Sequence, residues 1–203
     1  MLETLDLAYV GRGIHEELVA YIADQEGYFE DEGVRVALRD GVAWRTERLR
    51  RGATIGLGRS MLSRLTDDIP WTGLSVSTHR PLLAWVGDHF QIPTVGVMVD
   101  PTYIPLDSPA LHAVVRANRR ALRTIQDRPE TVVEHVRSFM GRHTDEEIRA
   151  HLDRFVIPHF THDGQADLDI GDAAIAAVAE ELGVPAKFRA ADVYRTDLVP
   201  TDQ

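Results

Sequence analysis

Short apolar runs alternate along this chain with stretches in which apolar residues recur at helical spacing. The first run covers residues 5–10 and leads into a Gly-Arg-Gly turn, after which Ile14, Leu18 and Ile22 share one face of a helix. Further strands are expected over residues 34–38, 53–58, 74–78, 82–86 and 94–99, and short helices over 42–51 and 62–67. The alternation predicts an α/β domain with a parallel, doubly wound sheet.

Helix boundaries in the second half of the chain have local signals. Residues 107–109, Asp-Ser-Pro, place a capping side chain before a proline and predict a helix start. Residues 144–147, Thr-Asp-Glu-Glu, predict a capping box that opens a helix reaching Phe155. A last helix is expected over residues 169–182, closed by Gly183.

Two glycines enclose the turn between the first helix and the second strand. Gly27 and Gly33 are expected to take positive φ there, which glycine does without steric cost. Tyr28 and Phe29 follow the first glycine and are expected to cover the end of the core. Residues 20–41 therefore predict a helix, a glycine-bounded turn and a strand, in that order.

This turn resembles that of a known family. Gly-Tyr-Phe at residues 27–29 and Glu-Gly-Val at 32–34 resemble the substrate-binding proteins of alkanesulfonate, nitrate and taurine ABC transporters and the pyrimidine-precursor synthases of thiamine biosynthesis. Residues 113–130 resemble the late helix pair of those proteins, and residues 163–164 with 191–194 resemble the end of their fold. The resemblance implies a periplasmic-binding-protein type II fold, in which two α/β lobes enclose a ligand.

The chain departs from that pattern where a second lobe should begin. Only seven residues, 87–93, separate the strands expected at 82–86 and 94–99, whereas a lobe needs at least about 50 residues. We therefore expect a single shortened domain, with a first-lobe α/β core over 1–99, a returning helical part over 100–203, and most of the second lobe missing. A partner subunit could supply the other wall of a ligand cleft, so a homo-oligomer is expected.

Charge and composition narrow the classes of function. The 203-residue chain has a formal net charge of −10, so nucleic-acid binding would need a concentrated basic face. Arg45, Arg48, Arg50 and Arg51 are interpreted as a solvated helix face, and no nucleic-acid partner is expected. The chain has no cysteine and no apolar stretch long enough to span a membrane. Because no signal-like segment follows Met1, we expect a cytoplasmic protein, the alternative being one whose leader was removed.

The loops that leave the carboxyl ends of the strands are the expected ligand site, because open α/β sheets bind ligands there. Three loops offer arginines that can pair with an acid, together with glycine N–H groups and polar side chains. The predicted ligand-binding residues are Gly11, Arg12, Gly13 and His15 in the first loop, Arg59, Ser60 and Met61 in the second, and Thr78, His79 and Arg80 in the third. The same loops also fit a tight turn, a helix cap and an ordinary strand connection, respectively.

No metal or cofactor is expected. His159, His162 and Asp163 cluster within five residues, but further ligands at zinc-site spacing are missing from the sequence. Pyridoxal phosphate could form a Schiff base only at the sole lysine, Lys187. Nucleoside-phosphate and dinucleotide glycine motifs are also absent from the sequence.

The function expected from these features is recognition of a small acidic or heteroaromatic ligand, such as an organic acid, a sulfonate or a pyrimidine-like compound. The main alternative is an enzyme on the same scaffold, a dehydratase, a decarboxylase or a pyrimidine-precursor-synthase-like lyase. In that case His15 and His79 are the general-base candidates, since neutral imidazole is available near pH 7. The synthase alternative lacks the cysteine motif of its relatives. A further alternative is a degenerate scaffold whose former cleft face is a dimer surface.

Overall fold

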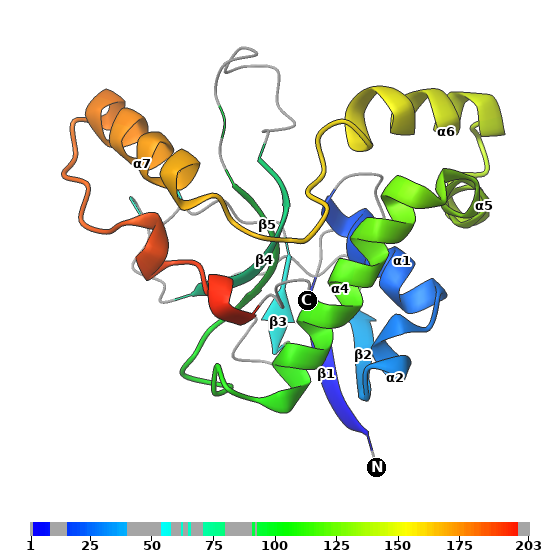
Figure 1. The fold of residues 1–203 in the computed structure, drawn as a ribbon, viewed down its shortest axis with the longest axis horizontal. Coiled ribbons are helices and arrows are strands. Elements are labelled where there is room, and N and C mark those ends of the chain that lie inside the picture. Colours follow the sequence, from blue (N-terminus) through cyan, green and yellow to red (C-terminus); the bar gives the residue numbers. More distant parts are fainter. Residues whose placement is uncertain are drawn as a thin grey trace.

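The computed structural model describes residues 2–8, 16–39, 54–57, 62, 65, 71–79, 91 and 93–198. Helices lie on both faces of a five-stranded sheet (Figure 1). The strands are β1 (Glu3–Ala8), β2 (Val34–Arg39), β3 (Ile55–Gly56), β4 (Thr72–Thr78) and β5 (Thr94–Val99). The helices expected at 42–51 and 62–67 and the strand expected at 82–86 lie outside the described residues, apart from Leu62 and Leu65.

The sheet is mixed, and not wholly parallel as predicted. Its strand order is β2-β1-β3-β5-β4. Strand β1 pairs in parallel with β2 and β3, whereas β5 pairs antiparallel with both β3 and β4. The prediction was wrong for β5 because the chain re-enters the sheet at the edge where β4 ends, and so runs back between β3 and β4. Strands β1, β3 and β4 point the same way and share one carboxyl edge.

The helices follow the predicted order, with one addition and one change. The described α-helices are α1 (Glu16–Gln25), α2 (Tyr28–Asp31), α4 (Pro109–Asp127), α5 (Pro129–Phe139), α6 (Asp145–His151) and α7 (Leu168–Leu182). The short α2 was not predicted. The helix expected to reach Phe155 changes after α6 to a π-helical turn, Leu152–Val156. Two 3-10 turns follow α7, at Ala190–Asp192 and Thr196–Leu198.

Two of the predicted helix-boundary signals act through the expected contacts. The Thr144 hydroxyl accepts a hydrogen bond from the Glu147 N–H at 3.2 Å, and the Glu147 carboxylate accepts one from the Thr144 N–H at 2.9 Å. Gly183 ends α7 in the left-handed region, at φ 64°. Ser108 precedes α4 as predicted, but its side chain makes no capping hydrogen bond.

Two hydrophobic clusters lie on the two faces of the sheet. In β5, Val97 and Val99 belong to the larger cluster and Met98 to the smaller, because successive side chains of a strand point to opposite faces. The larger cluster contains the apolar faces of α1, α4 and α5. The smaller contains Ala174 and Ile175 of α7, so α7 covers the face opposite to α1 and α4. The sheet is therefore wound with helices on both faces, as predicted.

The turn between α1 and β2, residues 26–33, is held by one side of α4. Gly27 and Gly33 take φ values of 72° and 89°, which confirms their predicted role. Tyr28 and Phe29 are buried, as expected. Four residues spaced four apart face the turn: Arg116, Arg120 and Thr124 of α4, and Arg128, which directly follows the helix.

The contacts across this turn are mainly between opposite charges. Arg116 Nε donates to Glu32 at 2.7 Å, and Arg120 pairs with Asp31 at 2.8 Å. The Arg120 guanidinium also lies 4.2 Å from the centre of the Tyr28 ring. The glutamate of the Gly-Tyr-Phe-x-x-Glu-Gly pattern is thus engaged in a structural contact within the folded chain.

The outer edge of β4 is covered by two segments from the end of the chain. Gly73 N–H donates to the Val193 carbonyl at 2.8 Å, and Arg195 N–H donates to the Gly73 carbonyl at 2.9 Å. Further along the strand, Val76 N–H donates to Gly164 at 2.8 Å, and Thr161 N–H donates to Ser77 at 2.8 Å. These bonds satisfy backbone groups that an open sheet edge would expose.

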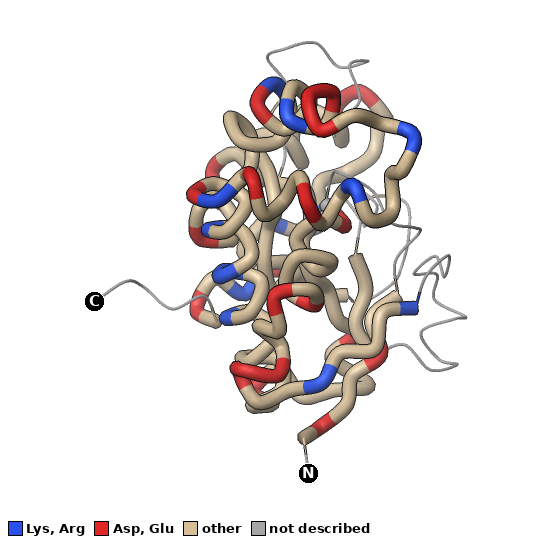
Figure 2. Tube along the Cα trace, turned by 90° about the vertical axis from the view of Figure 1, so that its right-hand side faces the viewer, with Lys and Arg blue, Asp and Glu red and all other residues tan. Residues whose placement is uncertain are grey.

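Charged residues of both signs are interspersed along the described chain (Figure 2). The arginines at positions 45, 48, 50 and 51 lie outside the described residues. None of the helices that the structure describes is both long and apolar enough to cross a membrane.

Candidate ligand site

The three predicted ligand loops leave the same edge of the sheet. The loop at residues 9–15 follows β1, the loop at 58–61 follows Leu57 just after β3, and the third begins at His79 after β4. Because these strands are mutually parallel, their carboxyl ends lie together. We call this the carboxyl edge.

Most of the predicted ligand-binding residues lie outside the described part of the chain. These are Gly11, Arg12, Gly13, His15, Arg59, Ser60, Met61 and Arg80. Their role stays a prediction, and the structure supplies the starting points of the loops that carry them. Thr78 and His79 are described, so their surroundings can be examined directly.

Thr78 is a buried structural residue at the carboxyl edge. Its side chain is buried, and its hydroxyl donates to the His159 carbonyl at 2.8 Å. Thr78 also forms an antiparallel bridge with Phe160. These contacts bring the segment after the π-helical turn against the end of β4, and they engage the hydroxyl that was predicted to contact a ligand.

His79 lies half-buried beside the start of α7. Its Nε2 accepts a hydrogen bond from the backbone N–H of Asp167 at 2.9 Å. Burial lowers the pKa of His79 from its ordinary value of 6.5, and the carboxylates of Asp167 and Asp163 oppose that shift. The imidazole is therefore mainly neutral at pH 7.

Two features of this edge were missed in the sequence. Asp167 supplies the N–H bound by His79, and its carboxylate accepts hydrogen bonds from Asp169 N–H and Ile170 N–H, both at 3.0 Å. An aspartate before a helical apolar pattern is a capping signal that could have been found. The other feature is the approach of residues 159–164 to β4, for which the sequence has no local signal.

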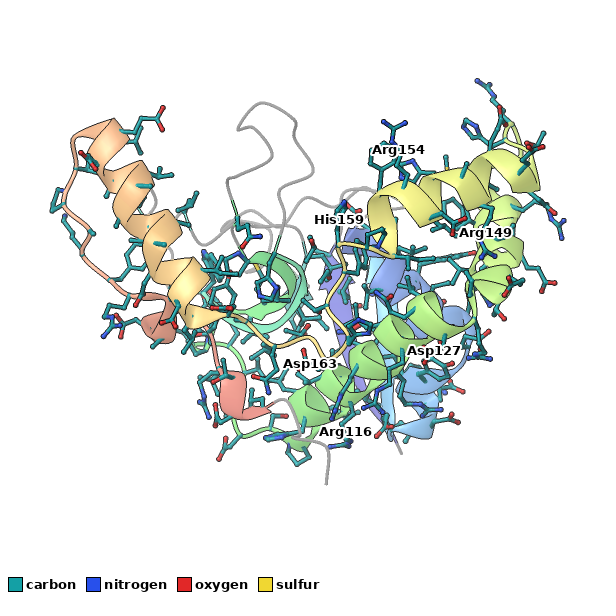
Figure 3. All side chains as sticks on the ribbon, turned by 45° about the horizontal axis from the view of Figure 1, so that its top comes forward. Arg116, Asp127, Arg149, Arg154, His159 and Asp163 are labelled. Carbon is teal, nitrogen blue, oxygen red and sulfur yellow. The ribbon has the colours of Figure 1, made fainter. Side chains whose placement is uncertain are left out.

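Of the three residues considered for metal binding, His159, His162 and Asp163, the last has a structural hydrogen bond. His159 lies where the chain leaves the π-helical turn, and Asp163 lies further along the same segment (Figure 3). Asp163 accepts a hydrogen bond from Gln165 N–H at 2.9 Å. Within the described ranges, no group of three or more His, Asp or Glu residues could hold a metal ion. Lys187, the only lysine, is exposed in the segment after α7.

A hollow of about 570 Å³ lies at the opposite edge of the sheet, where β1 begins and α4 starts. It is lined by Glu3, Thr4, Leu5, Thr54, Tyr103, Ile104, Pro105, Asp107, Ser108 and Pro109. Its charged lining residues are Glu3 and Asp107, which would repel an anion. This hollow does not suit an acidic ligand.

Comparison with known proteins identifies the fold. No family model matches the chain, and no curated protein matches it. The chain is similar to the solved structure of a protein from Bordetella bronchiseptica RB50, with a TM-score of 0.75 and 13% identity, over 96% of this chain and 95% of that one.

A second similar structure is that of a conserved Candida albicans gene product, described as defining a new family with the generic periplasmic binding protein structural fold. The TM-score is 0.71 and the identity 11%, over 100% of this chain and 99% of that one. At these identities the likeness shows the fold alone. The chain has a periplasmic-binding-protein-like α/β fold, built as one lobe with C-terminal helices.

Proposed function

We propose that this protein binds a small acidic organic ligand at the carboxyl edge. The observation that carries the proposal is the convergence of β1, β3 and β4 at that edge. Helix α1 also begins there, because it follows the loop that leaves β1. The positive ends of helix dipoles favour anions.

The ligand class follows from the side chains that the three loops carry. Arg12, Arg59 and Arg80 can pair with a carboxylate or a sulfonate through two parallel hydrogen bonds. A pyrimidine-like ligand also offers acceptor oxygens. A relation to the ABC-transporter substrate-binding proteins, a cytoplasmic location and a homo-oligomeric state are further parts of the proposal.

Thermal unfolding with a panel of sulfonates, aromatic acids and pyrimidines tests the proposed function. A ligand present at about 100 times its Kd should stabilise the folded protein by about 2.7 kcal/mol. Each hit is then recovered and checked for chemical change, since a binding protein returns it unaltered and an enzyme converts it. No stabilisation by any class would count against the proposal.

Matched variants test whether the ligand binds at the carboxyl edge. Arg12→Ala and Arg80→Ala should each weaken binding without unfolding the protein. Arg35→Ala is the control, because this substitution removes the same charge at the other end of the sheet. Arg35 of β2 lies opposite Thr4 of β1 in the strand register, near the edge where β1 begins. Normal binding by both loop variants, or an equal loss in the control, would show that the ligand lies elsewhere.

A further inference from the structure

We infer that His79 contacts the ligand as a neutral hydrogen-bond donor through Nδ1–H, and that its Nε2 connects this donor to the start of α7. The inference rests on the proposed function, because it assumes that a ligand occupies the carboxyl edge. The state of the imidazole itself follows from the structure and does not depend on a ligand.

The hydrogen bond from Asp167 determines which ring nitrogen carries the proton. A backbone N–H can only donate, so Nε2, 2.9 Å from the Asp167 nitrogen, must offer its lone pair. A neutral imidazole has one N–H, which must then be at Nδ1. Asp167 is the hydrogen-bond partner of His79 among the residues that the structure describes.

The charged groups facing His79 come from the segment before α7. Asp163 and Asp167 attract a positive imidazolium, whereas burial disfavours it and has the larger effect on the pKa. Protonation would also place a second N–H at Nε2, directed at the Asp167 N–H. Both burial and this repulsion keep the ring neutral.

The tautomer limits the chemistry of the ligand. The free nitrogen Nδ1 carries a hydrogen and has no lone pair to accept a proton, so it cannot act as the general base considered in the sequence analysis. It can donate to a carboxylate or sulfonate oxygen, or to a carbonyl oxygen of a pyrimidine. The ligand must therefore present an acceptor at this position.

The same contact links the ligand to α7. Asp167 is the N-cap of this helix, and its carboxylate already accepts from two N–H groups of the first turn. Its own N–H is held by His79. A ligand that orders the His79 ring therefore also orders the residue that caps α7.

Two substitutions of His79 test the roles of its two ring nitrogens separately. In His79→Gln the amide oxygen can occupy the place of Nε2 and accept from Asp167, but no donor remains at the place of Nδ1. In His79→Asn the amide nitrogen can replace Nδ1–H, but the acceptor for Asp167 is lost. We expect H79Q to keep the unfolding temperature and bind the panel hit about tenfold more weakly, the loss of one hydrogen bond.

H79N should show the opposite result, with near-normal affinity and an unfolding temperature about 3 °C lower. Equal effects of the two variants on affinity and stability would overturn the inference. Because either variant could fold poorly, the wild-type protein supplies an independent measurement. Long-range proton–nitrogen NMR of the ligand-free protein at pH 7 should show the His79 proton on Nδ1, with the signal identified by its absence from H79Q.

A proton on Nε2, or a ring that is charged at pH 7, would refute the inference even where ligand binding is found. If the panel contains no ligand, the proposed function fails together with the ligand contact. The tautomer and the link to α7 are then judged by the NMR spectrum and the unfolding temperatures alone.

Discussion

The turn at residues 26–33 and the outer edge of β4 are held in place by different kinds of contact. The turn is held by charged side chains of α4, in an ion pair between the partly exposed Arg120 and the largely exposed Asp31. The edge of β4 is held by backbone hydrogen bonds and by the ring of Tyr194, which is buried against Gly73. Exposed ion pairs adjust to change, whereas a close-packed ring does not, so the two regions should tolerate substitution very differently.

The largest effect is expected at the edge of β4. A Cβ added at Gly73 would lie 2.5 Å from Cδ1 of the Tyr194 ring, and the Tyr194 hydroxyl is fixed by donation to the Pro93 carbonyl at 3.0 Å. Gly73→Ala should therefore lower the free energy of unfolding by about 3 kcal/mol. Chemical denaturation measures this value.

Gly141→Ala is the matched control, because a Cβ there meets no atom within 4 Å. A loss at Gly73 no larger than that at Gly141 would show that the ring moves aside easily. The outer edge of β4 would then tolerate substitution as well as the turn at residues 26–33 does.

A smaller effect is expected in the turn. Arg120→Ala removes the ion pairs with Asp31 and Glu32 and the contact with the Tyr28 ring. The loss in unfolding free energy should be about 1 kcal/mol, and it should shrink in high salt. The control is Arg35→Ala, whose pair with Glu30 is 3.6 Å long and exposed on both sides. A loss for Arg120→Ala as large as that for Gly73→Ala would remove the contrast between the two regions.

The smallest effect on stability is expected from Glu26, and it depends on pH. A hydrogen bond from His135, at 2.8 Å, is the main cause that lowers the pKa of Glu26 below its ordinary value of 4.5, and Arg128 adds to it against the effect of burial. Because the folded pKa is the lower one, the contribution to stability is complete above pH 4.5 and is lost as the pH falls through the folded value.

Glu26→Gln should thus cost under about 1 kcal/mol near neutral pH, and its difference from the wild type should shrink below pH 4.5. Unfolding measured from pH 7 to pH 3 checks this. Glu134→Gln, which removes an exposed carboxylate from α5, is the control. A difference that grows in acid would contradict the assigned direction.

Much of the fold could be predicted from local sequence signals. The glycines at 27 and 33 and the capping box at Thr144 act over four residues or fewer, so their effect could be predicted from neighbouring residue types. The candidate site was harder to predict. Strand order placed its loops on one edge, but the role of His79 depends on Asp167, a partner 88 residues away.

By itself, the sequence determined the succession of the described strands and helices apart from α2, the glycine turn and the resemblance to binding proteins. Tertiary structure alone decided the reversed direction of β5, the two segments that cover β4 and the nitrogen of His79 that remains free. The physical reason lies in the contacts involved. The Thr161 hydroxyl donates to the Val76 carbonyl from 85 residues away, and a backbone carbonyl accepts such a bond whatever side chain its residue carries.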